Sequence, residues 1–159
     1  MIPWASLLAA TAWVDFAVIA LSKVFPLTTS LSVWYKEFGV VALGSDILII
    51  VLGIALAMFL VPGAKGLTLI GVAVGIQLLH DVLFYIGIIQ GVPTGQNRIL
   101  DLFKRYAAEG SWKILLADAG MVAASVYLME TMEETLTRDQ IVWVGLLAVY
   151  SLLYILYTR

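Results

Sequence analysis

The residues best placed to do chemistry are one histidine and four aspartates that interrupt apolar stretches. His80 and Asp81 stand together in a long apolar stretch, with Gln77 one helical turn before Asp81 and Tyr85 one turn after it. Three further apolar stretches each carry one aspartate: Asp15, Asp46 and Asp118. Because ionisable groups are costly inside a membrane, an ionisable residue found there is by default predicted to belong to a functional site.

The composition predicts a membrane protein. Of the 159 residues, 62% are apolar and 13% are charged, and the mean hydropathy is +1.02. Soluble domains are closer to half apolar and one quarter charged. A net charge of −2 argues against nucleic acid as a partner, and the absence of cysteine excludes disulfides, thiolate metal sites and cysteine nucleophiles. We also predict no cofactor.

Five apolar stretches are long enough to cross a bilayer as helices. We predict an all-α polytopic bundle in a single domain, 1–159, with spans over about 4–25, 40–61, 67–92, 112–129 and 140–157. The first four carry the aspartates and are expected to form a four-helix core, whereas the fifth is expected to be peripheral. Pro26 and Pro62 are expected to end the first two helices, because proline disfavours helix in the residue before it.

Small residues predict where helices pack closely. Gly53 and Ala57 are four residues apart, and so are Gly71 and Gly75. Such spacing lets helix backbones approach within a membrane, either inside one chain or in a homo-oligomer. We therefore expect both pairs to lie at helix contacts, with no role in chemistry.

The connections between spans offer two candidate partner surfaces besides the lipid bilayer. Apolar residues recur at helical spacing over Ile99–Ala107, which predicts an amphipathic helix over about 97–109 at the interface or on a partner. Glu130–Asp139 is expected to be an acidic loop. Residues 26–39, rich in aromatic residues, are expected to lie along the interface.

The basic residues predict the orientation. If the five spans alternate in direction, seven basic residues face one side of the membrane and only Lys65 and Arg138 face the other. The seven are Lys23, Lys36, Arg98, Lys104, Arg105, Lys113 and Arg159. The positive-inside rule then places the N-terminus outside and the C-terminus in the cytosol. At a rise of about 1.5 Å per residue, all four intramembrane aspartates fall between the midplane and the inner half of the bilayer.

Three interpretations of this acidic layer stay open. The carboxyl groups could lock the bundle through hydrogen bonds, or relay protons or cations in a transporter. His80 with several aspartates could also hold Mn, Fe or Zn. An enzyme is the least favoured, because Gly44-Ser45-Asp46 lacks the GxGD pattern of intramembrane aspartyl proteases and no P-loop, metalloprotease or nucleophile-elbow motif occurs.

Several spaced residues between about 4 and 128 resemble a group of small uncharacterised polytopic membrane proteins of bacteria and of large DNA viruses of algae and protists. The matching residues are Trp13-Val-Asp15, Trp34-Tyr35-xxx-Gly39, Gly71-xxx-Gly75 with His80-Asp81, and Trp112 with Asp118. The chain departs from the group at His80, where a tyrosine is expected before the aspartate. The viral members imply a virion or a virus-modified host membrane, with capsid proteins as partners, and the group has no established activity to transfer.

The sequence therefore favours a structural or assembly role in a membrane. The alternative is a proton- or cation-coupled channel or transporter. That alternative would use Asp15, Asp46, His80, Asp81 and Asp118.

Overall fold

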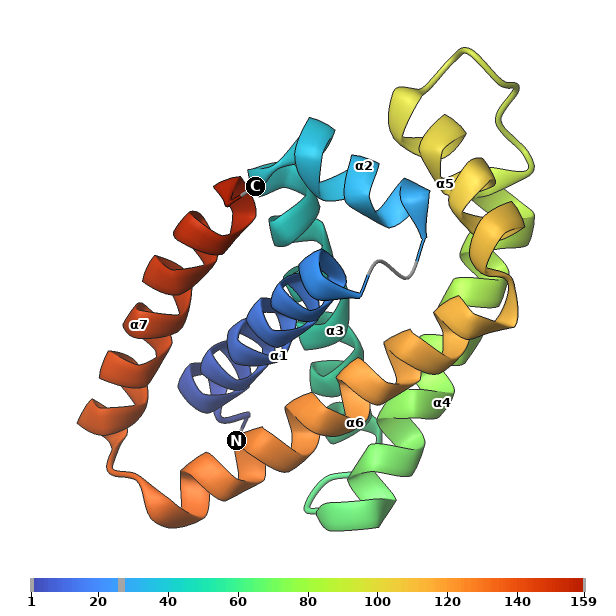
Figure 1. Ribbon diagram of the computed structural model, residues 1–159. Helices are drawn as coiled ribbons and strands as arrows, with labels where there is room; N and C mark the ends of the chain where they lie inside the picture. Colours follow the sequence, from blue (N-terminus) through green and yellow to red (C-terminus); the bar gives the residue numbers. More distant parts are fainter. Residues whose placement is uncertain (1, 26–27, 159) are drawn as a thin grey trace.

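A computed structural model describes residues 2–25 and 28–158 (Figure 1). These residues form seven α-helices and one π-helical segment, without a strand. The elements are α1 (Trp4–Val24), α2 (Thr29–Phe38), α3 (Val40–Leu60), α4 (Gly66–Phe84), η1 (Tyr85–Ile89), α5 (Arg98–Gly110), α6 (Trp112–Thr135) and α7 (Arg138–Tyr157). Pro26, the predicted end of the first span, and Arg159 lie outside the described residues.

Five helices are long and apolar enough to cross a bilayer: α1, α3, α4 continued by η1, α6 and α7. This confirms the all-α fold and indicates a membrane-integral protein. The amphipathic helix is also confirmed, as α5. The side chain of Asn97, just before the helix, accepts from the amide groups of Ile99 and Leu100 and caps its start. A shorter helix, α2, occupies the connection for which the sequence predicts only an interfacial segment.

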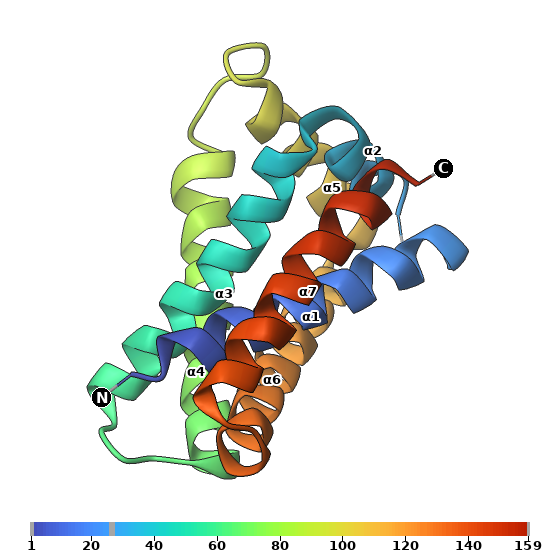
Figure 2. The same ribbon diagram turned by 90° about the vertical axis from the view of Figure 1, so that its left-hand side faces the viewer.

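The ribbon places α2 and α5 at the same end of the bundle, and the α3–α4 and α6–α7 turns at the other (Figures 1 and 2). The core between α1, α3, α4 and α6 is apolar and includes Leu7, Ile54, Leu69, Val126 and Met129, all fully or almost fully buried. Six of the seven basic residues assigned to the inner side stand on or beside α2 and α5, or at the helix ends that meet them.

Helix α7 is part of the core, so the prediction of a peripheral fifth helix is wrong. Trp13 on α1 donates its indole N–H to the Val144 carbonyl oxygen at 3.1 Å. A Cβ added at Gly145 would lie 3.3 Å from the Cβ of Ala9, which leaves no room for a larger side chain. The prediction of a peripheral helix was based on the absence of ionisable residues within this span. Small residues on both helices nevertheless allow α1 and α7 to pack closely.

The predicted acidic loop Glu130–Asp139 is also wrong. Helix α6 continues to Thr135 and α7 begins at Arg138, so the turn consists of Leu136 and Thr137. Glutamate is a good helix former, and a helix does not stop where its apolar part ends. Glu130 also accepts from the Gly66 amide at 2.9 Å, which joins α6 to the start of α4.

The two small-residue pairs have different outcomes. Ala57 is fully buried, and a Cβ added at Gly53 would lie 3.8 Å from the side-chain oxygen of Gln77, so this pair lies at a helix contact as predicted. A Cβ at Gly71 or Gly75 would meet nothing within 4 Å of it. Within one chain, the prediction of a contact there is wrong, because α4 packs through the buried row of Ala73 and Gln77, about 200° around the helix.

Candidate functional site

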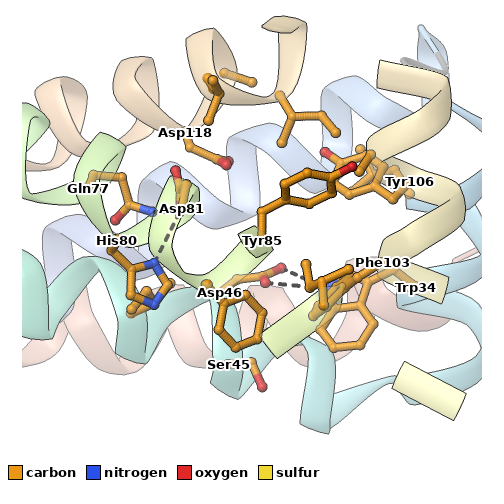
Figure 3. Close-up of a pocket in the computed structure, with 18 of the residues that line it drawn as sticks. Trp34, Ser45, Asp46, Gln77, His80, Asp81, Tyr85, Phe103, Tyr106 and Asp118 are labelled. Atoms are coloured by element: carbon orange, nitrogen blue, oxygen red, sulfur yellow. Dashed lines mark hydrogen bonds and ion pairs between the residues drawn. The ribbon is translucent and has the colours of Figure 1, made fainter. Parts of the chain in front are cut away.

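A cavity of about 740 Å³ lies between the helices near the end occupied by α2 and α5 (Figure 3). Six of the seven predicted site residues line it: Asp46, Gln77, His80, Asp81, Tyr85 and Asp118. Most of the remaining wall is apolar or aromatic. Of the described residues that line the cavity, none is lysine or arginine, so no permanent positive charge balances its three carboxyl groups.

On α4, Gln77, His80 and Asp81 form one hydrogen-bonded group. The Gln77 amide donates to Asp81 Oδ1 at 2.8 Å, and His80 Nδ1 lies 3.1 Å from the same oxygen. The other carboxylate oxygen of Asp81 is buried and has no hydrogen-bond partner among the described residues. The His80 ring stacks on Phe84, with centroids 5.6 Å apart. Asp81 therefore still has one oxygen that can accept a proton or a cationic donor.

The π-helical segment η1 follows this group and begins at Tyr85. The amide of Gln90 bonds to the Tyr85 carbonyl at 3.0 Å, a five-residue bond that widens the helix beside the cavity. Such π-segments occur often at functional sites. Sequence periodicity predicts one regular helix over 67–92 and carries no signal for this change.

Asp46 is held by two donors from α2. Its oxygens accept from Trp34 Nε1 at 3.1 and 3.2 Å and from the Tyr35 hydroxyl at 2.9 Å. Burial raises the pKa of Tyr35 well above its usual range, and the nearby carboxyl groups of Asp46 and Asp15 raise it further. Tyr35 therefore stays protonated as a donor. The sequence predicted that the aromatic residues before Gly39 lie at the level of the lipid headgroups, and it missed their role as donors to Asp46. The available signal was the neighbouring indole N–H and phenol O–H of Trp34 and Tyr35, shortly before Asp46 in the chain.

Asp118 on α6 faces the cavity without a fixed partner (Figure 3). It makes no side-chain hydrogen bond within the residues that the structure describes. Tyr106 on α5 lies nearby: burial raises its pKa above the usual range, and the carboxyl groups of Asp118 and Asp46 add to this. The hydroxyl of Tyr106 is therefore a neutral group that can donate a hydrogen bond toward the carboxyl groups.

Asp15 is the one predicted aspartate that does not line the cavity. It is fully buried in α1, and neither of its carboxylate oxygens has a hydrogen-bond partner in the described part of the chain. The hydroxyl of Thr11, one turn earlier, is equally buried and unpartnered. Asp15 is nevertheless close enough to affect the pKa of Tyr35. It therefore lies behind the donor pair that holds Asp46.

The carboxyl groups and the histidine do not form a metal centre. Among the described residues, no three histidine, aspartate or glutamate side chains come together as a metal site would require. Zn, Mn and Fe sites in proteins bring at least three such ligands to one point. The geometry therefore does not support the predicted alternative of a Mn, Fe or Zn site.

The chain uses the same arrangement twice, which the sequence reading missed. In each half a long apolar helix leads to an amphipathic helix, and a one-residue turn leads to a second long helix: α1–α2–α3, then α4 with η1–α5–α6. The turn residues, Gly39 and Ser111, have positive φ angles of 49° and 47°. Asp46 follows Gly39 by seven residues, and Asp118 follows Ser111 by seven. These two carboxyl groups thus occupy equivalent positions.

The first helices of the two halves correspond as well. Thr11 precedes Asp15 by four residues, and Gln77 precedes Asp81 by four. The second helices bury residues at the same offsets from the turn: Ile50 and Val122, Ile54 and Val126, Ala57 and Met129. The cavity lies between the halves, with α1, α2 and α3 contributing from the first and α4, η1, α5 and α6 from the second.

The two amphipathic helices are joined by one carboxylate. Glu109 on α5 accepts from the Ser30 amide at 3.0 Å and from the Ser30 hydroxyl at 2.8 Å. These hydrogen bonds stabilise the ionised form and hold the pKa of Glu109 below its ordinary value of 4.5. The contact brings together the two halves at the cavity end of the bundle.

We therefore expect the α2–α5 contact to weaken in acid. Because the pKa is lowered in the folded state, its stabilising contribution is present above pH 4.5 and is lost as the pH falls through the lowered value. In NMR spectra, the Ser30 amide signal should titrate with a midpoint below 4.5, and Glu109→Gln should abolish this titration. Glu134→Gln, at the other end of the bundle, is the control. A midpoint at or above 4.5 would contradict the assignment.

Comparisons of the chain with protein-family models, with curated proteins and with solved structures found no match. The resemblance to small polytopic membrane proteins therefore stays a prediction, and the function is inferred from the geometry of the cavity.

Proposed function

We propose that this chain is a membrane-integral transporter in which protons or other cations interact with the carboxyl groups around the cavity. The observation that carries the proposal is one cavity lined by Asp46, Asp81 and Asp118 and, among its described lining residues, by no lysine or arginine. Uncompensated carboxyl groups at a shared site attract protons and cations. Asp118, which has no fixed partner, and Asp81, with one unpaired oxygen, are the two groups best placed to exchange them.

The two-fold use of one arrangement supports this proposal. Many transporters consist of structural repeats, and their substrate sites lie between the repeats. Here the cavity lies between two halves that each supply carboxyl groups at equivalent positions. A purely structural polar core would need hydrogen-bond partners for its carboxyl groups, but it would not need an open cavity between the halves.

We infer that the cavity end of the bundle faces the cytosol. Helices α2 and α5 lie at that end and carry Lys36, Lys104 and Arg105, whereas the opposite turns carry only Lys65 and Arg138. By the positive-inside rule, the N-terminus is then outside and the C-terminus inside. A reporter enzyme fused after Arg159 should be active only in the cytosol; extracellular activity would overturn the orientation.

Purified protein in liposomes that contain a pH-sensitive dye tests the transport proposal. We expect the wild type to dissipate an imposed pH gradient, and Asp118→Asn to reduce the rate to that of empty liposomes. Asp118 is suited to this test because it makes no side-chain hydrogen bond within the described residues, so its replacement breaks no such contact. Asp81→Asn is a second variant from the same half.

Asp139→Asn is the matched control, because Asp139 is exposed at the start of α7, at the end of the bundle opposite α2 and α5 (Figure 1). It should leave the flux unchanged. If wild-type liposomes are no leakier than empty ones, or if Asp118→Asn and Asp81→Asn alter only thermal stability, then the structural or assembly role favoured by the sequence is the better account.

A further inference from the structure

We propose that the transported substrate is an organic cation with an aromatic or otherwise apolar body, bound between the carboxyl groups and the aromatic wall of the cavity. This inference rests on the proposed transport function and specifies its substrate class. Three features of the cavity lead to it: the charge it leaves unbalanced, the chemistry of its walls, and its size relative to the separation of its acidic groups.

The charge of the cavity selects a cation. Asp46 is neutralised by no basic side chain and accepts only from Trp34 and Tyr35, which are neutral donors. Asp81 has one unpartnered oxygen. The Asp118 carboxyl group makes no side-chain hydrogen bond within the described residues. A positively charged group in the cavity would meet acidic acceptors from α3, α4 and α6 (Figure 3). An anion would meet them as well, without a compensating lysine or arginine.

The walls of the cavity suit an apolar cation rather than a hydrated one. Six aromatic residues line it: Trp34, Tyr35, Phe84, Tyr85, Phe103 and Tyr106. The Phe103 ring stands between two of the others, with its centroid 4.9 Å from that of Trp34 and 6.4 Å from that of Phe84. Aromatic faces attract cations, most strongly when water is displaced, and quaternary ammonium ligands are bound in this way.

The size of the cavity argues against a bare metal ion as the substrate. Its volume of about 740 Å³ lies in the range of sites for drug-sized ligands. Among the described residues, the acidic groups do not gather as closely as a metal ion requires. An organic cation can bridge separated acidic and aromatic groups, because its charge and its apolar body occupy different parts of the same cavity.

Binding of tetraphenylphosphonium to the protein in nanodiscs, measured by calorimetry against empty nanodiscs, tests this inference. Tetraphenylborate, an anion of the same shape, separates charge recognition from apolar partitioning. We expect the cation to bind about tenfold more tightly than the anion through charge–charge attraction, and Asp118→Asn to remove most of that difference. Phe103→Leu should weaken cation binding about 2- to 30-fold. Asp139→Asn should bind as the wild type does.

The two proposals can fail separately. Proton flux in liposomes without tetraphenylphosphonium binding would overturn the organic-cation inference and leave cation transport standing. Equal binding of tetraphenylphosphonium and tetraphenylborate, or cation binding that Asp118→Asn and Phe103→Leu leave unchanged, would also overturn it. The absence of both flux and binding would overturn the proposed function itself.

Discussion

Replacement of Asp15 by valine or by alanine is expected to raise the free energy of unfolding by about 1–3 kcal/mol. The physical reason is that Asp15 is fully buried and neither of its oxygens has a hydrogen-bond partner among the described residues. A polar group in that position loses its hydration on folding, and the nearby Tyr35 hydroxyl donates to Asp46 at 2.9 Å instead. Thermal unfolding in detergent, followed by circular dichroism, measures the effect.

The two substitutions at Asp15 bracket the size of the side chain. If packing decides the outcome, alanine will lower the stability because it leaves a cavity, whereas valine will raise it because it fills the space. If the buried carboxyl group decides the outcome, both variants will be more stable than the wild type. We also expect both variants to lose proton flux, since a destabilising group is commonly kept where function requires it. A variant that unfolds at a lower temperature, or a stabilised variant with normal flux, would contradict this account of Asp15.

The second large effect is expected at Asp46, where leucine should lower the free energy of unfolding by about 2–6 kcal/mol, at roughly 1–3 kcal/mol for each of the two donors left unpaired. Trp34 is 5% exposed and Tyr35 8%, so both donors are largely shielded from solvent and depend on this acceptor. Helix α2 should detach from α3 first, because these two hydrogen bonds join them. Chemical unfolding in detergent gives the size of the loss.

Asp118→Leu is the matched control for Asp46→Leu. The two residues occupy equivalent positions in the two halves, but Asp118 accepts no side-chain hydrogen bond within the described residues, so its replacement should cost much less. Combining Asp46→Leu with Trp34→Phe and Tyr35→Phe should recover part of the stability, because the unpaired donors are then gone. Equal losses for Asp46→Leu and Asp118→Leu would show that the α2 donors are unimportant.

Hydrophobic length and spacing were sufficient to predict the membrane helices. Each of the five spans begins within two residues of its predicted start, because an apolar run longer than a bilayer is thick has few alternatives to a helix. The inward face of the first span was predictable too: Thr11 and Asp15 share a helix face and are both buried. The end of α6 was not, since helix propensity carried it past its apolar part to Thr135.

Packing partners were beyond the reach of a single sequence. Gly71 and Gly75 have the spacing of a helix contact, yet they face away from the other helices, whereas α7 packs on α1 through Ala9 and Gly145. A spacing rule says that a face permits close approach. It does not say which helix arrives there, because that depends on the whole arrangement in space.

The sequence by itself determined that this is an all-helical protein with five helices long and apolar enough to cross a membrane, and that four of them each carry one aspartate. Only the tertiary structure decided how those aspartates differ. It gives Asp46 two donors from α2, leaves Asp118 facing a cavity, and buries Asp15 without a partner. Depth follows from position along a helix, but solvation and hydrogen bonding depend on residues brought close from elsewhere in the chain, so the local pattern could not distinguish them.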